Sequence, residues 1–174
     1  MKKYILTLII TISIAKVVLG QTKTETEDWI NSKMSKLINR SVSDNSKYIT
    51  GTPGFSATTT LKAFNLRDGM MSYSYEISYY SFGSLSKEII RGENIHIKYL
   101  QEIKTFDINH DNYRLELKFD NYFDIDVISD NDTKDFNVDF KIYKLEDNLG
   151  ERFAKAFKHY KGFYPTPNKS KETF

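Results

Sequence analysis

Residues 107–112 (Asp-Ile-Asn-His-Asp-Asn) are the part of this sequence that comes nearest to a metal-binding motif. They place oxygen-bearing side chains at alternate positions, as a calcium-binding loop does. Such a loop also needs glycine at its sixth position and a bidentate glutamate at its twelfth, where this chain has Asn112 and Lys118. The flanking residues alternate as strands do. The sequence therefore predicts a solvated hairpin turn here rather than a calcium site.

The three histidines do not have the spacing of a metal or catalytic site. No two of His96, His110 and His159 are four residues apart on one helix. The chain has no cysteine, which excludes disulfides, thiolate-bound metals and thiol catalysis. It also lacks a phosphate-binding glycine loop and a Gly-x-Ser-x-Gly elbow. We predict no catalytic residue, no metal and no cofactor, while a hydrolase with a dispersed site stays open as an alternative.

Four tyrosines form the candidate binding surface. Tyr73, Tyr75 and Tyr79 fall on one face of a predicted strand in which serines alternate with them, and Tyr80 and Phe82 lie beside or behind this face. Aromatic side chains on a sheet can stack on sugars or form a protein interface. Packing in the core is the alternative, and it is favoured because the serines mark the other face as the one in contact with water.

Strands are the elements that would position most of these residues. From about residue 47 to residue 142, apolar and polar residues alternate, and the breaks between strands are short. A parallel crossover needs a dozen residues or more, so neighbouring strands are expected to be antiparallel. Asp68-Gly69 predicts one hairpin turn and Gly92-Glu93-Asn94 another. The predicted strands are 47–50, 55–65, 71–79, 95–99, 113–119, 123–127 and 136–142, and residues 84–91 are ambiguous.

An amphipathic helix is predicted before the strands. Residues 24–39 place apolar side chains on one stripe, and Thr24 and Glu27 have the spacing of a capping box. A polar loop at residues 41–46 is expected to end this helix. The stripe consists of Trp29, Ile30, Met34, Leu37 and Ile38.

A second amphipathic helix is predicted after the strands. Asn148 and Glu151 predict its N-terminal cap, and Gly162 its end. Its apolar stripe consists of Leu149, Phe153, Ala156, Phe157 and Tyr160. An antiparallel meander with one apolar face must cover that face. We therefore predict an α+β fold: a bent antiparallel β-sheet or partly open barrel of six to eight strands, with an N-terminal and a C-terminal amphipathic helix.

Residues 1–20 have the features of a signal peptide. Lys2 and Lys3 precede an uncharged, mostly apolar run at residues 4–15, and Gly20 suits a signal peptidase. The run is too short to cross a bilayer, so we expect cleavage near Gly20 and no stable membrane insertion afterwards; an uncleaved anchor is the alternative. The predicted organisation is a signal peptide at 1–20, a single globular domain at 21–164 and a flexible tail at 165–174.

The basic charge of the chain comes from the signal segment. The chain has 25 Lys and Arg against 23 Asp and Glu, a formal net charge of +2, and residues 1–20 contain three lysines and no acid. The mature chain would be slightly acidic, which gives no reason to expect nucleic acid as a partner. The absence of cysteine in an exported chain favours a bacterial source and a periplasmic or extracellular location. Its abundance of Lys, Asn, Ile, Tyr and Phe, with few Ala and Pro, indicates an AT-rich genome.

The predicted order of elements resembles the pleckstrin-homology-like layout. Residues 151–160 resemble the terminal helix of uncharacterised small secreted bacterial proteins with this layout, and residues 24–37, with Glu27 and Trp29, resemble their opening helix. The resemblance carries no functional residues. A basic phosphoinositide loop is also absent, because Asp68 offsets Arg67 in the only comparable turn. We expect an exported, non-enzymatic binding or structural module of unknown ligand and partner; a carrier of a small hydrophobic ligand between sheet and C-terminal helix is an alternative.

Overall fold

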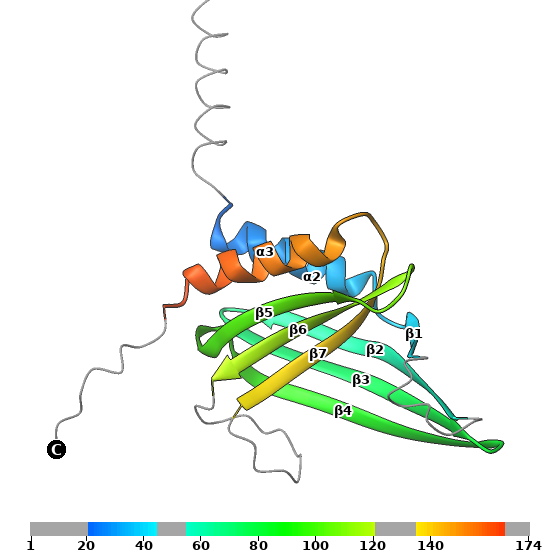
Figure 1. The fold of residues 1–174 in the computed structure, drawn as a ribbon. Helices are drawn as coiled ribbons and strands as arrows, with labels where there is room; N and C mark the ends of the chain where they lie inside the picture. The colour runs from blue at the N-terminus through cyan, green and yellow to red at the C-terminus, as the bar shows by residue number, and fades with distance from the viewer. Residues whose placement is uncertain (1–20, 45–54, 121–134, 166–174) are drawn as a thin grey trace, which may run out of the picture.

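The computed structural model of the chain describes residues 21–44, 55–120 and 135–165 (Figure 1). The predicted signal peptide, the predicted strands 47–50 and 123–127, and residues 166–174 of the predicted tail lie outside these ranges. Within them the chain forms antiparallel sheets and two α-helices. The α+β class expected from the sequence is therefore confirmed.

The described strands follow one another as a meander in two sheets. The first sheet has the order β1 (Ser41–Asp44), β2 (Phe55–Arg67), β3 (Met70–Ser81), β4 (Ser84–His96), and the second has the order β5 (Leu100–Asp107), β6 (Asn112–Asp120), β7 (Asp135–Tyr143). The observed strand pairs are all antiparallel. A 3₁₀ turn, η1 (Ile97–Tyr99), joins β4 to β5, which belong to different sheets. In the described part of the chain, the strands thus form two open sheets rather than one bent sheet or a closed barrel.

Three local predictions about strands and turns are wrong. The predicted polar loop at 41–46 contains β1, which pairs with residues 57–60 of β2. The predicted turn at 92–94 lies inside β4, where the register with β3 shifts and Asn94 has φ of 56°, as expected for a β-bulge. The predicted strand 95–99 gives way to η1 at Ile97. The ambiguous residues 84–91 are part of β4. In each case a pairing partner far along the chain decided the local conformation.

The first helix, α2 (Lys23–Ser35), starts before the predicted range and ends short of residue 39. Its N-cap is Thr22, whose hydroxyl accepts a hydrogen bond from the Glu25 amide at 3.2 Å, while the Glu25 carboxylate accepts from the Thr22 amide at 2.9 Å. The prediction that Thr24 and Glu27 form the capping box is therefore wrong. Glu27 lies two residues further along α2 than Glu25, and its carboxylate accepts hydrogen bonds from other elements of the fold instead.

The second helix, α3 (Leu149–Gly162), occupies the predicted range but lacks the predicted cap. Asn148 has a left-handed conformation with φ of 56°, and its side chain makes no capping hydrogen bond. The prediction of a cap from Asn148 and Glu151 is therefore wrong. The chain turns sharply at Asn148 to bring α3 back over the sheets, and that turn determines the conformation of the residue.

The apolar stripes of both helices close the core, as predicted. Figure 1 shows α2 and α3 on the same side of the sheets. α2 packs on β2 and α3, and α3 packs on β5 and β6. The ring of Trp29 meets the ring of Phe153 edge to face, with centroids 5.4 Å apart. The buried members of the two stripes are Ile30, Met34, Leu37, Leu149, Phe153, Phe157 and Tyr160.

Two polar links fix the helices to the turn between β2 and β3. The Asn31 side chain donates to the Leu66 carbonyl at 2.7 Å and accepts from the Leu66 amide at 2.9 Å. The buried Tyr160 hydroxyl donates to Glu27 and accepts from the Gly69 amide at 3.0 Å. Asp68 and Gly69 have φ of 50° and 78°, so the hairpin turn predicted there is confirmed.

Candidate binding surface on the β3–β4 hairpin

The structure separates the four candidate tyrosines along β3, and the first two pack inward. Tyr73 is only 6% exposed. Its ring stacks on Tyr75, with centroids 5.7 Å apart, and meets the ring of Phe140 from the second sheet at 5.2 Å. Burial raises the pKa of the Tyr73 hydroxyl and raises the pKa of Tyr75 to about 12. Tyr73 therefore belongs to the core, in agreement with the alternative that these tyrosines pack inside the protein.

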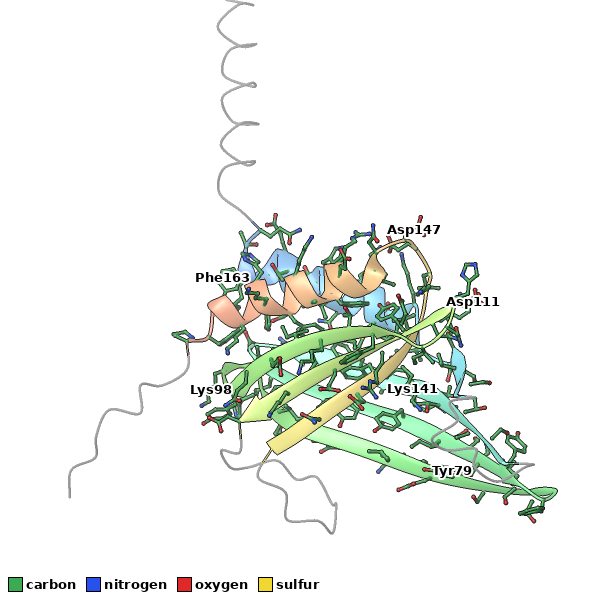
Figure 2. All side chains as sticks on the ribbon, viewed as in Figure 1. Tyr79, Lys98, Asp111, Lys141, Asp147 and Phe163 are labelled. Atoms are coloured by element: carbon green, nitrogen blue, oxygen red, sulfur yellow. The ribbon has the colours of Figure 1, made fainter. Side chains whose placement is uncertain are left out.

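Tyr79 lies further along β3, toward the β3–β4 turn (Figure 2), and Tyr80 follows it in the same strand. Tyr79 is half-buried, and its hydroxyl donates to Glu88 of β4 at 3.2 Å. Tyr80 points to the opposite face of the sheet and is 48% exposed. Figure 1 shows that the β3–β4 hairpin extends past the second sheet, which explains why this end of β3 is less covered. The four tyrosines thus do not form one surface.

Tyr80 and three further residues around this turn are exposed apolar side chains. Tyr80 pairs with Leu85 across the hairpin, and Ile89 lies four residues further along β4 on the same face, with Lys87 between them. Phe82 is in the turn and is 79% exposed. Large apolar side chains exposed close to one another are typical of interaction sites. We call Tyr80, Phe82, Leu85 and Ile89 the hairpin surface.

Of this surface, the sequence predicted Tyr80 as a binding residue and placed Phe82 beside it, but did not indicate Leu85 or Ile89. Leu85 and Ile89 were missed because residues 84–91 combine apolar and charged residues without a clear period. The signal that could have found them is the alternation of Leu85, Lys87 and Ile89 after the Phe82-Gly83 turn. That alternation predicts a shared face but does not show whether the face is covered.

Phe82 has a backbone conformation that is unusual for an aromatic residue. Phe82 and Gly83 form a two-residue turn with φ of 46° and 83°. Turns with two positive φ values favour Asn, Asp or Gly at both positions, because a bulky side chain is disfavoured there. The exposed ring gains little packing within the described fold in return. Unfavourable local conformations retained without compensation point to a role outside the fold.

The charges beside the hairpin surface compensate one another. The Glu76 carboxylate lies 3.1 Å from the Lys87 ammonium and 3.9 Å from that of Lys62, on the same face as Leu85 and Ile89. The hydrogen bond from Lys87 holds the pKa of Glu76 below its usual range, and the charge of Lys62 adds to this effect. The hairpin surface therefore combines exposed apolar side chains with a compensated ion pair, and Lys87 of that pair lies between Leu85 and Ile89.

The turn at residues 107–112 connects β5 to β6 as a hairpin, as predicted. Asn109 stabilises it: its side-chain oxygen accepts from the Asp111 amide at 2.9 Å and from the Asn112 side chain at 3.0 Å. The Asp107 carboxylate lies 2.8 Å from the Lys144 ammonium. Within the described ranges, no three Asp, Glu or His side chains are arranged to hold a metal ion.

A hollow of about 490 Å³ lies between this turn and the first turn of α3. Tyr113 lines it and is 3% exposed, and its hydroxyl has no hydrogen-bond partner among the described residues. Burial raises the pKa of this hydroxyl. Glu146, on the wall, forms ion pairs with Lys33 and Arg152, which lower its pKa. The Tyr113 hydroxyl is enclosed and the Glu146 charge is compensated, so neither group is presented to a ligand.

The three histidines lie in different parts of the fold. His96 ends β4 and its ring contacts Tyr99, with centroids 6.1 Å apart. His110 is fully exposed in the β5–β6 turn. Nε2 of His159 on α3 lies 2.8 Å from the carbonyl oxygen of Gln21. The structure brings no two of them together.

Comparisons with protein-family models, with curated proteins and with solved structures find no match for this chain. Neither helix in the described ranges is long and apolar enough to cross a membrane. The hairpin surface is therefore the feature of the described residues from which a function can be argued.

Proposed function

We propose that this protein is an exported binding module that contacts another polypeptide through the hairpin surface. The observation that carries this proposal is Phe82, a large aromatic side chain 79% exposed at the tip of a hairpin, in a conformation that favours asparagine or glycine. Tyr80, Leu85 and Ile89 extend the apolar surface along both strands. Aromatic anchors inside a polar border are typical of protein interfaces.

A ligand carrier is less well supported by the packing under α3. That alternative needs a lined space between the sheets and the C-terminal helix. In the described fold, Phe153 and Phe157 of α3 and Leu115 of β6 are fully buried there, in one continuous core. The hairpin surface needs no rearrangement of that core to receive a partner.

Export is supported by the sequence of residues 1–20 and is compatible with the packing of the residues that follow. Gln21, the first residue of the proposed mature chain, already contacts α3 through His159, and Thr22 caps α2. Cleavage after Gly20 would leave both contacts in place. The order of elements, a helix, a meander and a closing helix, is likewise the basis for a proposed relation to small secreted bacterial proteins of pleckstrin-homology-like layout.

The binding role is tested by placing a photo-crosslinking amino acid at Phe82 in the producing cell. The matched control is Arg67, the last residue of β2, whose side chain is 80% exposed and which pairs with the first residue of β3, at the opposite end from Phe82. We expect one discrete protein adduct from position 82 and none from position 67. Equal labelling at both positions, or no discrete adduct at position 82, would contradict the proposal.

Export is tested by determining the N-terminal residue of the protein recovered from outside the cytoplasm. We expect Gln21, because Gly20 and the apolar run before it suit a signal peptidase. An exported protein that begins at Met1 would contradict cleavage.

A further inference from the structure

β4 is an edge strand whose outer half offers an open side to another strand. In the first sheet β4 pairs with β3 alone among the described strands. The bulge around Gly92-Glu93-Asn94 interrupts the ladder, so residues 84–91 form the regular part of this edge. Regular exposed edges with apolar side chains readily pair with further strands. Three of the four residues of the hairpin surface lie on this hairpin's two strands, next to that edge.

The turn determines which backbone groups of β4 point outward. Phe82 and Gly83 make a two-residue loop, so Ser81 and Ser84 form the closing pair. In such a hairpin the closing pair exchanges backbone hydrogen bonds, and every second pair after it does the same. Leu85, Lys87 and Ile89 therefore direct their N–H and C=O groups away from β3, toward the open side. Their side chains lie on the same face as Glu76.

We propose that the chain forms a two-fold dimer by antiparallel pairing of β4 with β4 of a second copy, centred on Lys87. This inference rests on the proposed function and names the partner of the hairpin surface. In this register Leu85 lies opposite Ile89 of the second copy, twice by symmetry, and Ser86 lies opposite Glu88. The apolar pairs cover the exposed large apolar side chains of β4, and the serine hydroxyl can donate to the carboxylate.

The exposed apolar side chains favour this register and a second copy as the occupant, because each copy supplies both Leu85 and Ile89. The two Lys87 side chains would meet at the axis, where each lies 3.1 Å from its own Glu76, and that carboxylate also lies 3.9 Å from Lys62, so two glutamates offset part of the charge of four lysines. A shift of the centre to Glu88 would place two carboxylates directly opposite each other. A shift to Ile89 would place Lys87 opposite Arg91, again twice.

The register is tested with single cysteines, because the chain has none of its own. Directly opposed residues in a hydrogen-bonded antiparallel pair have Cα atoms about 5.5 Å apart, within disulfide reach, whereas diagonal neighbours are about 7–8 Å apart. We expect Lys87→Cys to give a disulfide-linked dimer on mild oxidation, with Glu88→Cys and Ile89→Cys linking far less. Equal linking at all three positions, or linking at 88 or 89 in preference to 87, would overturn the proposed pairing.

The dimer itself is tested by sedimentation equilibrium of the purified protein. We expect a concentration-dependent dimer and an increase of the dissociation constant by about tenfold or more in Ile89→Asp. Met70→Asp is the matched control, because Met70 is 43% exposed but lies at the other end of the hairpin. Both sites are exposed, and far-ultraviolet circular dichroism verifies that both variants are folded. A monomer at all concentrations, or equal weakening by both substitutions, would overturn the proposal.

The cross-linking experiment at Phe82 separates failure of the dimer from failure of the binding function. An adduct of twice the chain mass that contains only this chain supports the dimer. A discrete adduct with a different protein, together with a monomeric purified chain, overturns the dimer but leaves the hairpin surface as a binding site. No discrete adduct from position 82 overturns the binding function.

Discussion

The two halves of β3 have the same pairing but different environments. Along its whole length β3 pairs with β2 on one side and β4 on the other. In the first half, Met71 is fully buried and Tyr73 packs against Phe140 of the second sheet. In the second half, Tyr79 lies on the same face as Tyr73 but is only half-buried, and the turn residue Phe82 beyond it is 79% exposed. Coverage by a second layer, and not strand pairing, therefore distinguishes the core half from the hairpin half.

This difference separates the residues that stabilise the fold from those available for binding. The core half lies beneath the second sheet and close to the helices, where apolar burial provides most of the folding free energy. The hairpin half retains its backbone hydrogen bonds but leaves apolar side chains in water. Substitutions in the two halves should therefore have different consequences for stability and for association.

The largest difference is expected between two phenylalanines. Phe153→Ala removes a fully buried ring that contacts Trp29 and Phe157, and it should lower the free energy of unfolding by about 3–5 kcal/mol. Phe82→Ala should change it by less than about 0.5 kcal/mol, because the ring is mostly in water. Urea unfolding measures both values. Similar losses of stability in the two variants would mean that the hairpin turn contributes as much to the fold as the core does.

Gly92 lies near the boundary between the halves, and replacing it with any residue that has a Cβ atom should destabilise the fold. A Cβ atom at this position would lie 2.5 Å from Cε1 of Tyr73, so Gly92→Ala must displace a buried ring. We expect a loss of about 1–3 kcal/mol in the free energy of unfolding. Gly162→Ala, where a Cβ atom would meet no neighbour within 4 Å, is the control. A Gly92→Ala protein as stable as the control would mean that Tyr73 is not held where the structure places it.

Two glutamates with lowered pKa values make the stability of the fold depend on pH, one between the two helices and one on the β3–β4 hairpin. Glu146 binds Lys33 of α2 and Arg152 of α3, whereas Glu76 binds Lys87 on the hairpin. A carboxylate whose folded pKa is lowered stabilises the fold above its unfolded pKa, and this contribution is lost as the pH falls through the folded pKa. Glu146→Gln should therefore reduce stability near neutral pH, and the stability of this variant should fall less as the pH is lowered.

The matched variant Glu76→Gln should have a smaller effect on global unfolding, because its ion pairs link strands of one hairpin region rather than two helices. Thermal unfolding measured across the acid range compares the two variants. A larger effect from Glu76 than from Glu146 would mean that the hairpin contributes more to global stability than its exposure indicates.

The smallest predicted effect has the opposite sign. Phe82→Asn places a residue that favours positive φ at the first position of the β3–β4 turn, so it should raise the free energy of unfolding by up to about 1 kcal/mol. The same substitution should weaken association, because it removes the exposed ring. Urea unfolding and sedimentation equilibrium test the two expectations. A variant that is both less stable and equally associated would contradict the role given to Phe82.

Helix positions and strand alternation were predictable because they depend on local spacing. The stripes around Ile30 and Phe157, the Asp68-Gly69 turn and the alternation of β6 each follow from a short stretch of sequence. The helix caps were predicted incorrectly at Thr24 and Asn148, because several residues nearby have capping side chains and the path of the chain decides among them.

The binding surface was only partly predictable. The sequence places Tyr73, Tyr75 and Tyr79 on one face, and β3 has them so. It does not show that the second sheet covers Tyr73 more fully than Tyr79. Leu85 and Ile89 lie on the opposite face, and their exposure also depends on tertiary packing, since their alternation would look identical in a buried strand.

The sequence by itself determined the α+β class, the antiparallel meander and the apolar faces of both helices, because these depend on residue periods and short connections. Only the tertiary structure decided that the described strands divide into two sheets at η1, and that β1 forms from residues that look like a loop. It also decided which half of β3 is covered. Coverage depends on where distant segments pack, and no local pattern of residues specifies that.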